Sequence, residues 1–155
     1  MMDSLIEVMK KYLATNFSLY LKTHAFHWNV EGPNFPSYHK FFQKIYEEIW
    51  EASDDIAEHI RALNSYAPGS FKDYKQLTMI DDQTEYPLDD QQMLSILYAD
   101  NGTVIEAIKI AYKAAEFNNE IGLSNFLQDR MDKHKKLAWM LRATIKNAAM
   151  TSAKL

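Results

Sequence analysis

Apolar side chains recur every three or four positions along most of the chain, which is the spacing of an amphipathic helix. The first such segment runs from Leu5 to about Asn29 and ends at VEGPNFP. In the second segment, Ser37 is placed to cap the first turn. Its apolar stripe consists of Tyr38, Phe42, Ile45, Ile49, Ile56, Ile60 and Leu63. We therefore predict two long helices in the first half of the chain.

The second half repeats this arrangement after a long polar connection. NSYAPGS interrupts the pattern, FKDYKQL has the length of a short helix, and TMIDDQTEYP continues the connection. A third long helix is predicted from Asp89 and Asp90, whose charges suit a helix start, to about Asn118. The fourth predicted helix follows NNEIG, with its apolar side at Leu123, Leu127, Met131, His134, Leu141 and Ile145. The pattern predicts an all-α four-helix bundle with a short extra helix in a long crossover.

Composition agrees with this fold and narrows the chemistry. The 155 residues, 47% of them hydrophobic, fit one domain spanning 1–155, and four glycines and four prolines are few. Cysteine is absent, so any metal site must use imidazole and oxygen ligands. No apolar run approaches the roughly 20 residues that a membrane crossing needs, and the N-terminal sequence lacks a signal-peptide layout. We therefore expect a cytoplasmic protein with no membrane partner.

The charge distribution gives little support for binding nucleic acid. The formal net charge is −4, and MMDSLIEVMKKY balances two lysines with two acids. From Lys133 onward, however, the chain has six Lys or Arg residues and no Asp or Glu. A solvated helix face accounts for this basic end, and a contact with DNA is the alternative.

One face of the second predicted helix carries the chemically interesting residues. At about 100° per residue, the line through His39, Gln43, Asp54 and Glu58 lies roughly 150° from the apolar stripe. These side chains therefore point away from the subunit's own core. Asp54 and Glu58 lie one turn apart and can bind one cation if imidazoles supply more donors. Acid pairs at this spacing are also common on exposed helices.

Two aromatic residues, Tyr46 and Trp50, lie beside these acids and would be exposed on an isolated subunit. We therefore expect a second copy of the chain to cover this face. In such a pair, His27 and His39 of one subunit could meet the two acids of its mate.

The remaining histidines fit structural roles better than metal binding. His24 lies three residues before His27 on a partly apolar side, which favours packing in the core or an interface. His59 lies beside the acidic line and is interpreted as a surface residue. His134 lies within an apolar stripe, which predicts a buried histidine with satisfied hydrogen bonds.

The segment HWNVEGPNFPSYHKFFQKIYEEIWEASDDIAEHIRALNSYAPGS closely resembles the Dps family, or miniferritins, and DKHKKLAWMLRA resembles the family's last helix. The pattern is a His-Trp pair, a second His twelve residues after the first, and an Asp and a Glu four residues apart. The resemblance implies a ferritin-like subunit in a hollow dodecamer, with ferroxidase centres at two-fold interfaces. It implies oxidation of Fe(II), typically by hydrogen peroxide, and storage of Fe(III) mineral. His27, His39, Asp54 and Glu58 match the family's ligand positions, as metal-binding and catalytic residues, and Trp28 matches its nearby aromatic.

This chain departs from the family pattern at two places. Gln43 stands where an Asp usually follows the second His by four residues, so an iron position served by His39 and Gln43 should bind less tightly. At NNEIGLSNFLQD the family often places acids around a pore through which iron enters. Here Glu120 and Asp129 remain candidates, while Asn125 replaces an often acidic residue. The sequence leaves three functions open: a ferroxidase impaired at one iron position, a metal-sequestering shell, and a DNA-coating oligomer.

Overall fold

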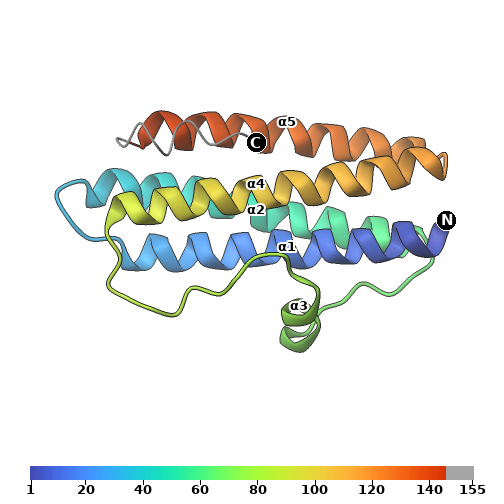
Figure 1. Cartoon of the computed structure of the whole chain (residues 1–155), viewed down its shortest axis with the longest axis horizontal. Helices are drawn as coiled ribbons and strands as arrows, with labels where there is room; N and C mark the ends of the chain where they lie inside the picture. Colours follow the sequence, from blue (N-terminus) through green and yellow to red (C-terminus); the bar gives the residue numbers. More distant parts are fainter. Residues whose placement is uncertain (146–155) are drawn as a thin grey trace.

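The apolar stripes of the sequence are the faces that meet in the bundle interior. A computed structural model describes residues 1–145 (Figure 1). Its helices are α1 (Met2–Asn29), α2 (Phe35–Ala62), α3 (Phe71–Leu77), α4 (Asp90–Phe117) and α5 (Ile121–Thr144). Between residues 1 and 145 there is no strand. The predicted all-α class is confirmed, and so is the short helix at FKDYKQL.

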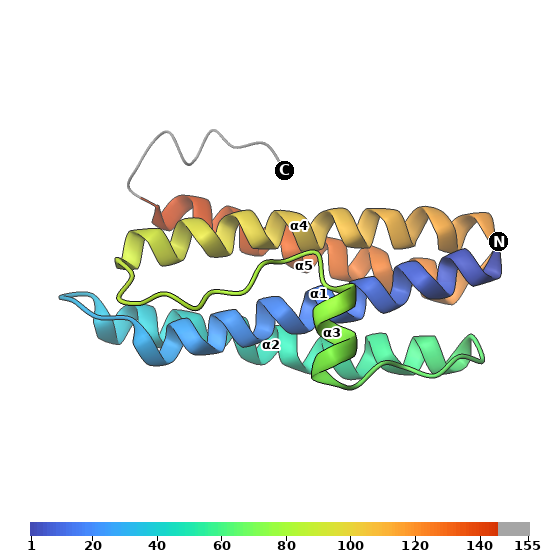
Figure 2. The ribbon, with the colours of Figure 1, turned by 60° about the horizontal axis from the view of Figure 1, so that its bottom comes forward.

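The helices form two antiparallel hairpins, α1 with α2 and α4 with α5. Because the crossover returns along the length of the bundle, α2 and α4 run in the same direction (Figures 1 and 2). Two hydrogen bonds attach the first part of the crossover after α3 to α1. Ser18 donates its hydroxyl to Thr78 Oγ1 at 2.7 Å, and the Met79 N–H donates to Thr15 Oγ1 at 3.1 Å. Burial of Ile80 adds an apolar contact to this attachment.

Helix starts follow the local sequence, with one correction. At α4, the Asp89 carboxylate accepts from the Gln91 N–H at 2.7 Å, and Gln92 closes a capping box, as the acidic start predicts. The predicted cap at Ser37 is wrong, because α2 already begins at Phe35. Pro36 lies in the first turn, where its fixed φ and missing N–H suit a helix start.

The core is mainly apolar, with a few buried polar side chains such as Asn101 and His134. On α2 the buried side chains are Phe42, Ile45, Ile49, Ala52, Ile56 and Ile60. This confirms the predicted stripe at its buried positions and leaves the opposite face of α2 available for other contacts. Among the helices of the described chain, none has both the length and the apolar character that a membrane crossing needs.

Candidate metal centre

His27 and His39 lie together at the turn between α1 and α2. Their ring centroids are 3.7 Å apart, with 14° between the planes. His27 Nδ1 lies 2.6 Å from the main-chain oxygen of His39, and His39 Nδ1 lies 2.7 Å from that of His27. Because a carbonyl oxygen only accepts, each ring donates its Nδ1–H. This assigns the tautomer in which both Nε2 lone pairs remain free to bind a metal ion.

The turn between the helices makes this pairing possible. Gly32 adopts a φ of 120°, a backbone angle that residues with a side chain rarely adopt. The chain reverses its direction here within a few residues. Because α1 and α2 then pack side by side in opposite directions, residues twelve positions apart face each other. The Gly/Pro-rich break thus positions both imidazoles without using a loop side chain.

Aromatic side chains surround the histidine pair. The His24 ring stacks on Tyr46, with centroids 3.8 Å apart, and the Tyr20 hydroxyl lies 3.0 Å from His24 Nδ1. Burial, and to a smaller extent the nearby His27, lowers the pKa of His24. Its contacts agree with the predicted packing role. Tyr46 is half-buried by this stack, so the expectation that it is exposed is wrong.

Asp54 and Glu58 are both exposed and lie one turn apart on α2. At 1.5 Å per residue, Asp54 lies about 22 Å from His39 along the helix axis. Residues 1–145 contain no group of three or more His, Asp or Glu side chains that could hold a metal ion. One subunit therefore brings the two histidines together and keeps the two acids apart from them. A centre that uses all four must draw on a second subunit.

Two tryptophans lie near these residues with most of their surface accessible. The exposed fraction is 59% for Trp28 and 57% for Trp50. Trp28 contacts His24, with ring centroids 4.1 Å apart, and Trp50 precedes Asp54 by one helical turn. The exposure expected for Trp50 is confirmed. Large apolar surface beside candidate ligands is typical of a face that a partner covers.

Gln43 lies one turn after His39 on the same helix. Gln43 is half-buried, and its amide nitrogen donates to Glu47 Oε1 at 2.8 Å. The amide oxygen therefore remains the atom with which Gln43 could contact a metal ion. An uncharged oxygen of this kind attracts a cation less strongly than a carboxylate.

The other two histidines contact the bundle. His59 is half-buried against Phe126, with ring centroids 4.5 Å apart, so it is a surface residue that packs partly against α5. His134 is buried, and its Nδ1 lies 2.7 Å from Asn101 Oδ1. Burial, and then the charge of Arg130, lowers the pKa of His134 to about 3. The predicted buried, hydrogen-bonded histidine is confirmed.

A hollow of about 550 Å³ lies beside the turn between α4 and α5. Its polar lining includes Glu116, Asn125 and Gln128. Glu120 and Asp129, the acids proposed from the sequence, are not part of this lining. Glu116 therefore supplies the carboxylate at this surface, and amides supply the other polar groups named here.

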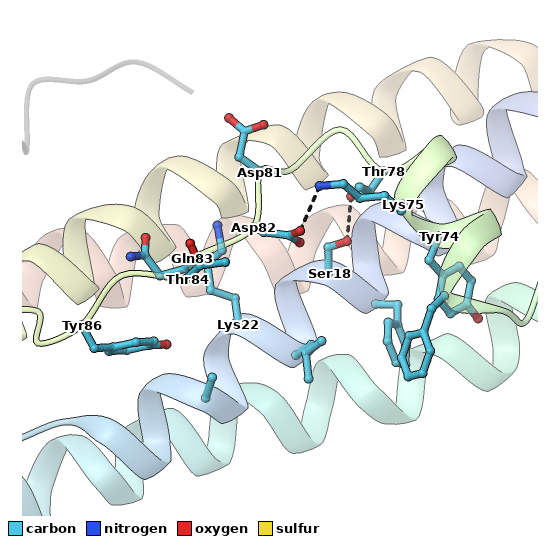
Figure 3. A pocket seen from close by; sticks show the side chains of 14 residues that line it. Ser18, Lys22, Tyr74, Lys75, Thr78, Asp81, Asp82, Gln83, Thr84 and Tyr86 are labelled. Carbon is cyan, nitrogen blue, oxygen red and sulfur yellow. Dashed lines mark hydrogen bonds and ion pairs between the residues drawn. The ribbon is translucent and has the colours of Figure 1, made fainter.

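A second cavity, of about 380 Å³, lies between α1, α3 and the crossover (Figure 3). Phe17, Leu21 and Tyr74 provide apolar lining, and Lys75 donates to Asp82 at 2.9 Å along the crossover side. Its residues come from segments far apart in the chain, so their spacing carried no signal in the sequence. The basic end proposed from the sequence reaches Lys146 and Lys154, which lie outside the described residues.

Known proteins resemble this chain over nearly its whole length. A family model for the ferritin-like domain matches residues 6–151. DNA protection during starvation protein 2 of Bacillus anthracis is 30% identical over 143 residues, which are 92% of this chain and 97% of that protein. The Dps protein of Vibrio cholerae O1, a ferritin-like diiron-carboxylate protein, has a crystal structure with a TM-score of 0.89 and 26% identity. That match covers 94% of this chain and 91% of the other.

Antigen TpF1 of Treponema pallidum gives a similar result. Its crystal structure matches with a TM-score of 0.90 and 26% identity, over 94% of each chain. An uncharacterized low temperature-induced protein of Nostoc is 31% identical over 145 residues, which are 92% of this chain and 80% of that protein. Sequence and fold thus lead to the same group of proteins.

Proposed function

The chain belongs to the Dps family of the ferritin-like superfamily, and on that premise we propose that it oxidises Fe(II) and stores the ferric product. The carrying observation is the histidine pair. His27 and His39 each present a free Nε2, while Asp54 and Glu58 lie too far along α2 to join them. The proposal takes residues 1–155 as one ferritin-like domain.

In the proposed pair of subunits, two copies of α2 lie antiparallel across a two-fold axis. Each copy then brings its histidines to the carboxylates of the other, which gives two centres per pair. Trp28 and Trp50 support this arrangement because pairing would bury apolar surface that one subunit leaves exposed. Six such pairs would make the hollow dodecamer that the family resemblance implies.

Iron is the substrate and cargo in this proposal. Imidazole and carboxylate donors suit Fe(II) and Fe(III). Asp54 and Glu58 of one subunit, with His27 of the other, would hold the better iron position. His39 and Gln43 would serve a weaker neighbouring position.

The redox chemistry balances with hydrogen peroxide as the oxidant. Two Fe(II) ions give up one electron each, and one peroxide takes both electrons and two protons to become two waters. Fe(III) would then move inward and form mineral on acidic side chains. Removal of both Fe(II) and peroxide would protect a cytoplasm from oxidative damage, which agrees with the location expected from the sequence.

Fe(II) titration without oxygen, followed by addition of peroxide, tests the proposal. Stopped-flow absorbance should show rapid Fe(III) formation in the natural chain and loss of at least about tenfold in rate, or about 1.4 kcal/mol, in Asp54→Ala/Glu58→Ala. Glu51→Ala/Asp55→Ala is the matched control, because it removes two exposed acids from the same helix. Equal rates in the natural chain and the Asp54/Glu58 variant would exclude the proposed centre.

Two other functions give different results in the same experiments. A metal-sequestering shell would bind Fe(II) but show no peroxide-dependent oxidation. A DNA-coating oligomer would bind DNA with an affinity that falls steeply as salt rises. The histidine pair favours the two metal-binding functions over the DNA coat, because its tautomers leave two nitrogen donors ready for metal.

A further inference from the structure

A layer of polar side chains crosses the bundle at mid-height. Each long helix contributes to it: Asn16 on α1, Glu48 on α2, Asn101 on α4, and Arg130 and His134 on α5. Every one of these residues lies within three positions of the midpoint of its helix. In ferritin-like di-iron proteins, side chains from facing helices hold metal in the bundle core. The polar layer of this chain therefore lies at a level where a helical bundle can hold a cation.

A guanidinium occupies the centre of this layer. Arg130 pairs with both carboxylate oxygens of Glu48, and its Nη2 lies 3.1 Å from Glu48 Oε2. The same Nη2 donates to His134 Nε2 at 3.1 Å. The exposed fraction of Arg130 is only 4%. One buried positive charge thus lies between a carboxylate and an imidazole nitrogen.

The state of His134 follows from its neighbours. Asn101 Nδ2 donates to the His134 carbonyl at 2.9 Å, so Asn101 Oδ1 faces the ring and accepts from Nδ1–H at 2.7 Å. Nε2 is then the nitrogen with the free lone pair, directed at Arg130. Because burial lowers the pKa of His134 to about 3, the ring is neutral at physiological pH. This is the state in which histidine binds metal, with Nδ1–H held by an amide or carbonyl oxygen.

A third oxygen lies beside the guanidinium. The Tyr12 side chain is fully buried, and its hydroxyl interacts with the Arg130 guanidinium. Burial raises the Tyr12 pKa to about 12, and the Arg130 charge acts in the opposite direction. Without the guanidinium, the phenol oxygen would be a buried polar atom that has lost its partner, which is costly and favours its coordination to another cation.

We propose that the Arg130 guanidinium occupies an interior cation position whose donors are Glu48 and His134, and that it keeps this position closed to divalent metal ions. When the guanidinium is removed, the neutral imidazole nitrogen and the Glu48 carboxylate lose their shared partner. Glu48 is 40% exposed and keeps only a longer ion pair with Lys133, at 3.8 Å. A divalent cation that accepts nitrogen and oxygen ligands then fills the space. Arg130 thereby confines metal binding to the surface of the subunit. This inference stands apart from the proposed function.

Cobalt(II) is the probe, because its visible absorption bands report ligand geometry and it is stable to oxidation under nitrogen. The background is Asp54→Ala/Glu58→Ala, which removes the proposed interface centre. Adding Arg130→Ala should create one further Co(II) site per subunit, with new visible bands. Adding His134→Gln as well should remove that site again. Arg142→Ala in the same background is the matched control, because it removes a guanidinium from the last turn of α5.

The inference is wrong if a folded Arg130→Ala protein binds no more Co(II) than its background, or if Arg142→Ala gains the same site. Circular dichroism checks folding. If Arg130→Ala unfolds without metal, Co(II) should restore its helical signal, and failure to do so in both Arg130→Ala and Arg130→Gln overturns the proposal. Methylguanidinium at millimolar concentration should displace Co(II) from the Arg130→Ala cavity, and retention of Co(II) would also contradict the proposed cation position.

Discussion

His27 and His39 form a reciprocal pair of hydrogen bonds. Each ring donates its Nδ1–H to the main-chain carbonyl oxygen of the other residue, at 2.6 and 2.7 Å. This reciprocal pair fixes two ring orientations with no further side chain. In many metal sites a carboxylate orients the histidine ligand, and a carboxylate can be protonated. Here both acceptors are main-chain carbonyl oxygens, whose charge does not change with pH. The donors are therefore ready before any metal arrives.

Nitrogen-15 NMR of the metal-free protein should show this tautomer directly. Both neutral rings should carry their proton on Nδ1, and both Nε2 signals should shift when Zn(II) is added. His134, which has the same tautomer but is blocked by Arg130, is the internal control and should not shift. An Nε2–H signal from His27 or His39 in the neutral state would contradict the assignment.

Mixed subunits should recover part of the lost activity. Neither His27→Ala/His39→Ala nor Asp54→Ala/Glu58→Ala should oxidise iron rapidly alone. In a heterodimer of the two, one of the two centres receives both intact halves. Random pairing makes half of all dimers mixed, so about one quarter of the natural rate should return when the variants are refolded together.

As a control, the two variants are refolded separately and then mixed, and the rate of iron oxidation is measured. Any activity in this mixture reports exchange of subunits between assembled oligomers. Full activity in either variant alone, or no recovery after joint refolding into stable oligomers, would exclude a centre shared between chains. Size-exclusion chromatography confirms that joint assembly has occurred.

Gln43→Asp should strengthen the weaker iron position. A carboxylate replaces a neutral amide oxygen one turn from His39, so affinity for the second Fe(II) should rise by about tenfold, equivalent to about 1.4 kcal/mol. Anaerobic Fe(II) titration by calorimetry measures this change. Gln43→Asn keeps an amide and should give no gain. Tight binding of two Fe(II) ions per centre in the natural chain would show that Gln43 imposes no penalty.

Acid should destabilise the fold through His134. Its pKa is about 3 when folded and about 6.5 when unfolded, so between these values only the unfolded chain takes up the proton. Stability should therefore fall by about 1.4 kcal/mol per pH unit as pH drops from 6.5 towards 3. Urea unfolding at pH 7, 6 and 5 measures this slope. His134→Gln should be less stable at pH 7 but should lack this part of the slope, and parallel curves would contradict the assignment.

Periodicity predicted the helices well because each buried face repeats every turn of the chain. The stripe from Phe42 to Ile60 and the short helix at FKDYKQL were both readable in this way. The start of α2 was not, since Ser37 and Pro36 are both plausible near an N-terminus and only the backbone decides between them. Local pattern thus predicts elements better than their ends.

The candidate centre was only partly readable. The helical wheel placed Asp54 and Glu58 on an outer face, and the structure confirms that both are exposed. The bonds between His27 and His39 depend on the geometry of the turn at Gly32, which composition does not specify. Similarly, 82 positions separate Glu48 from Arg130, so only the packed bundle reveals their pairing.

The distance between histidines and carboxylates on one subunit also bears on when a cell can begin to mineralise iron under the proposed function. A newly synthesised, unpaired chain carries the histidines and the carboxylates at two separate places. It therefore has no complete centre and does not oxidise Fe(II) rapidly. Because pairing is second order, doubling the newly made chains should raise the initial rate of centre formation about fourfold. Ferric mineral would then form only where enough subunits have associated to begin building a shell around it.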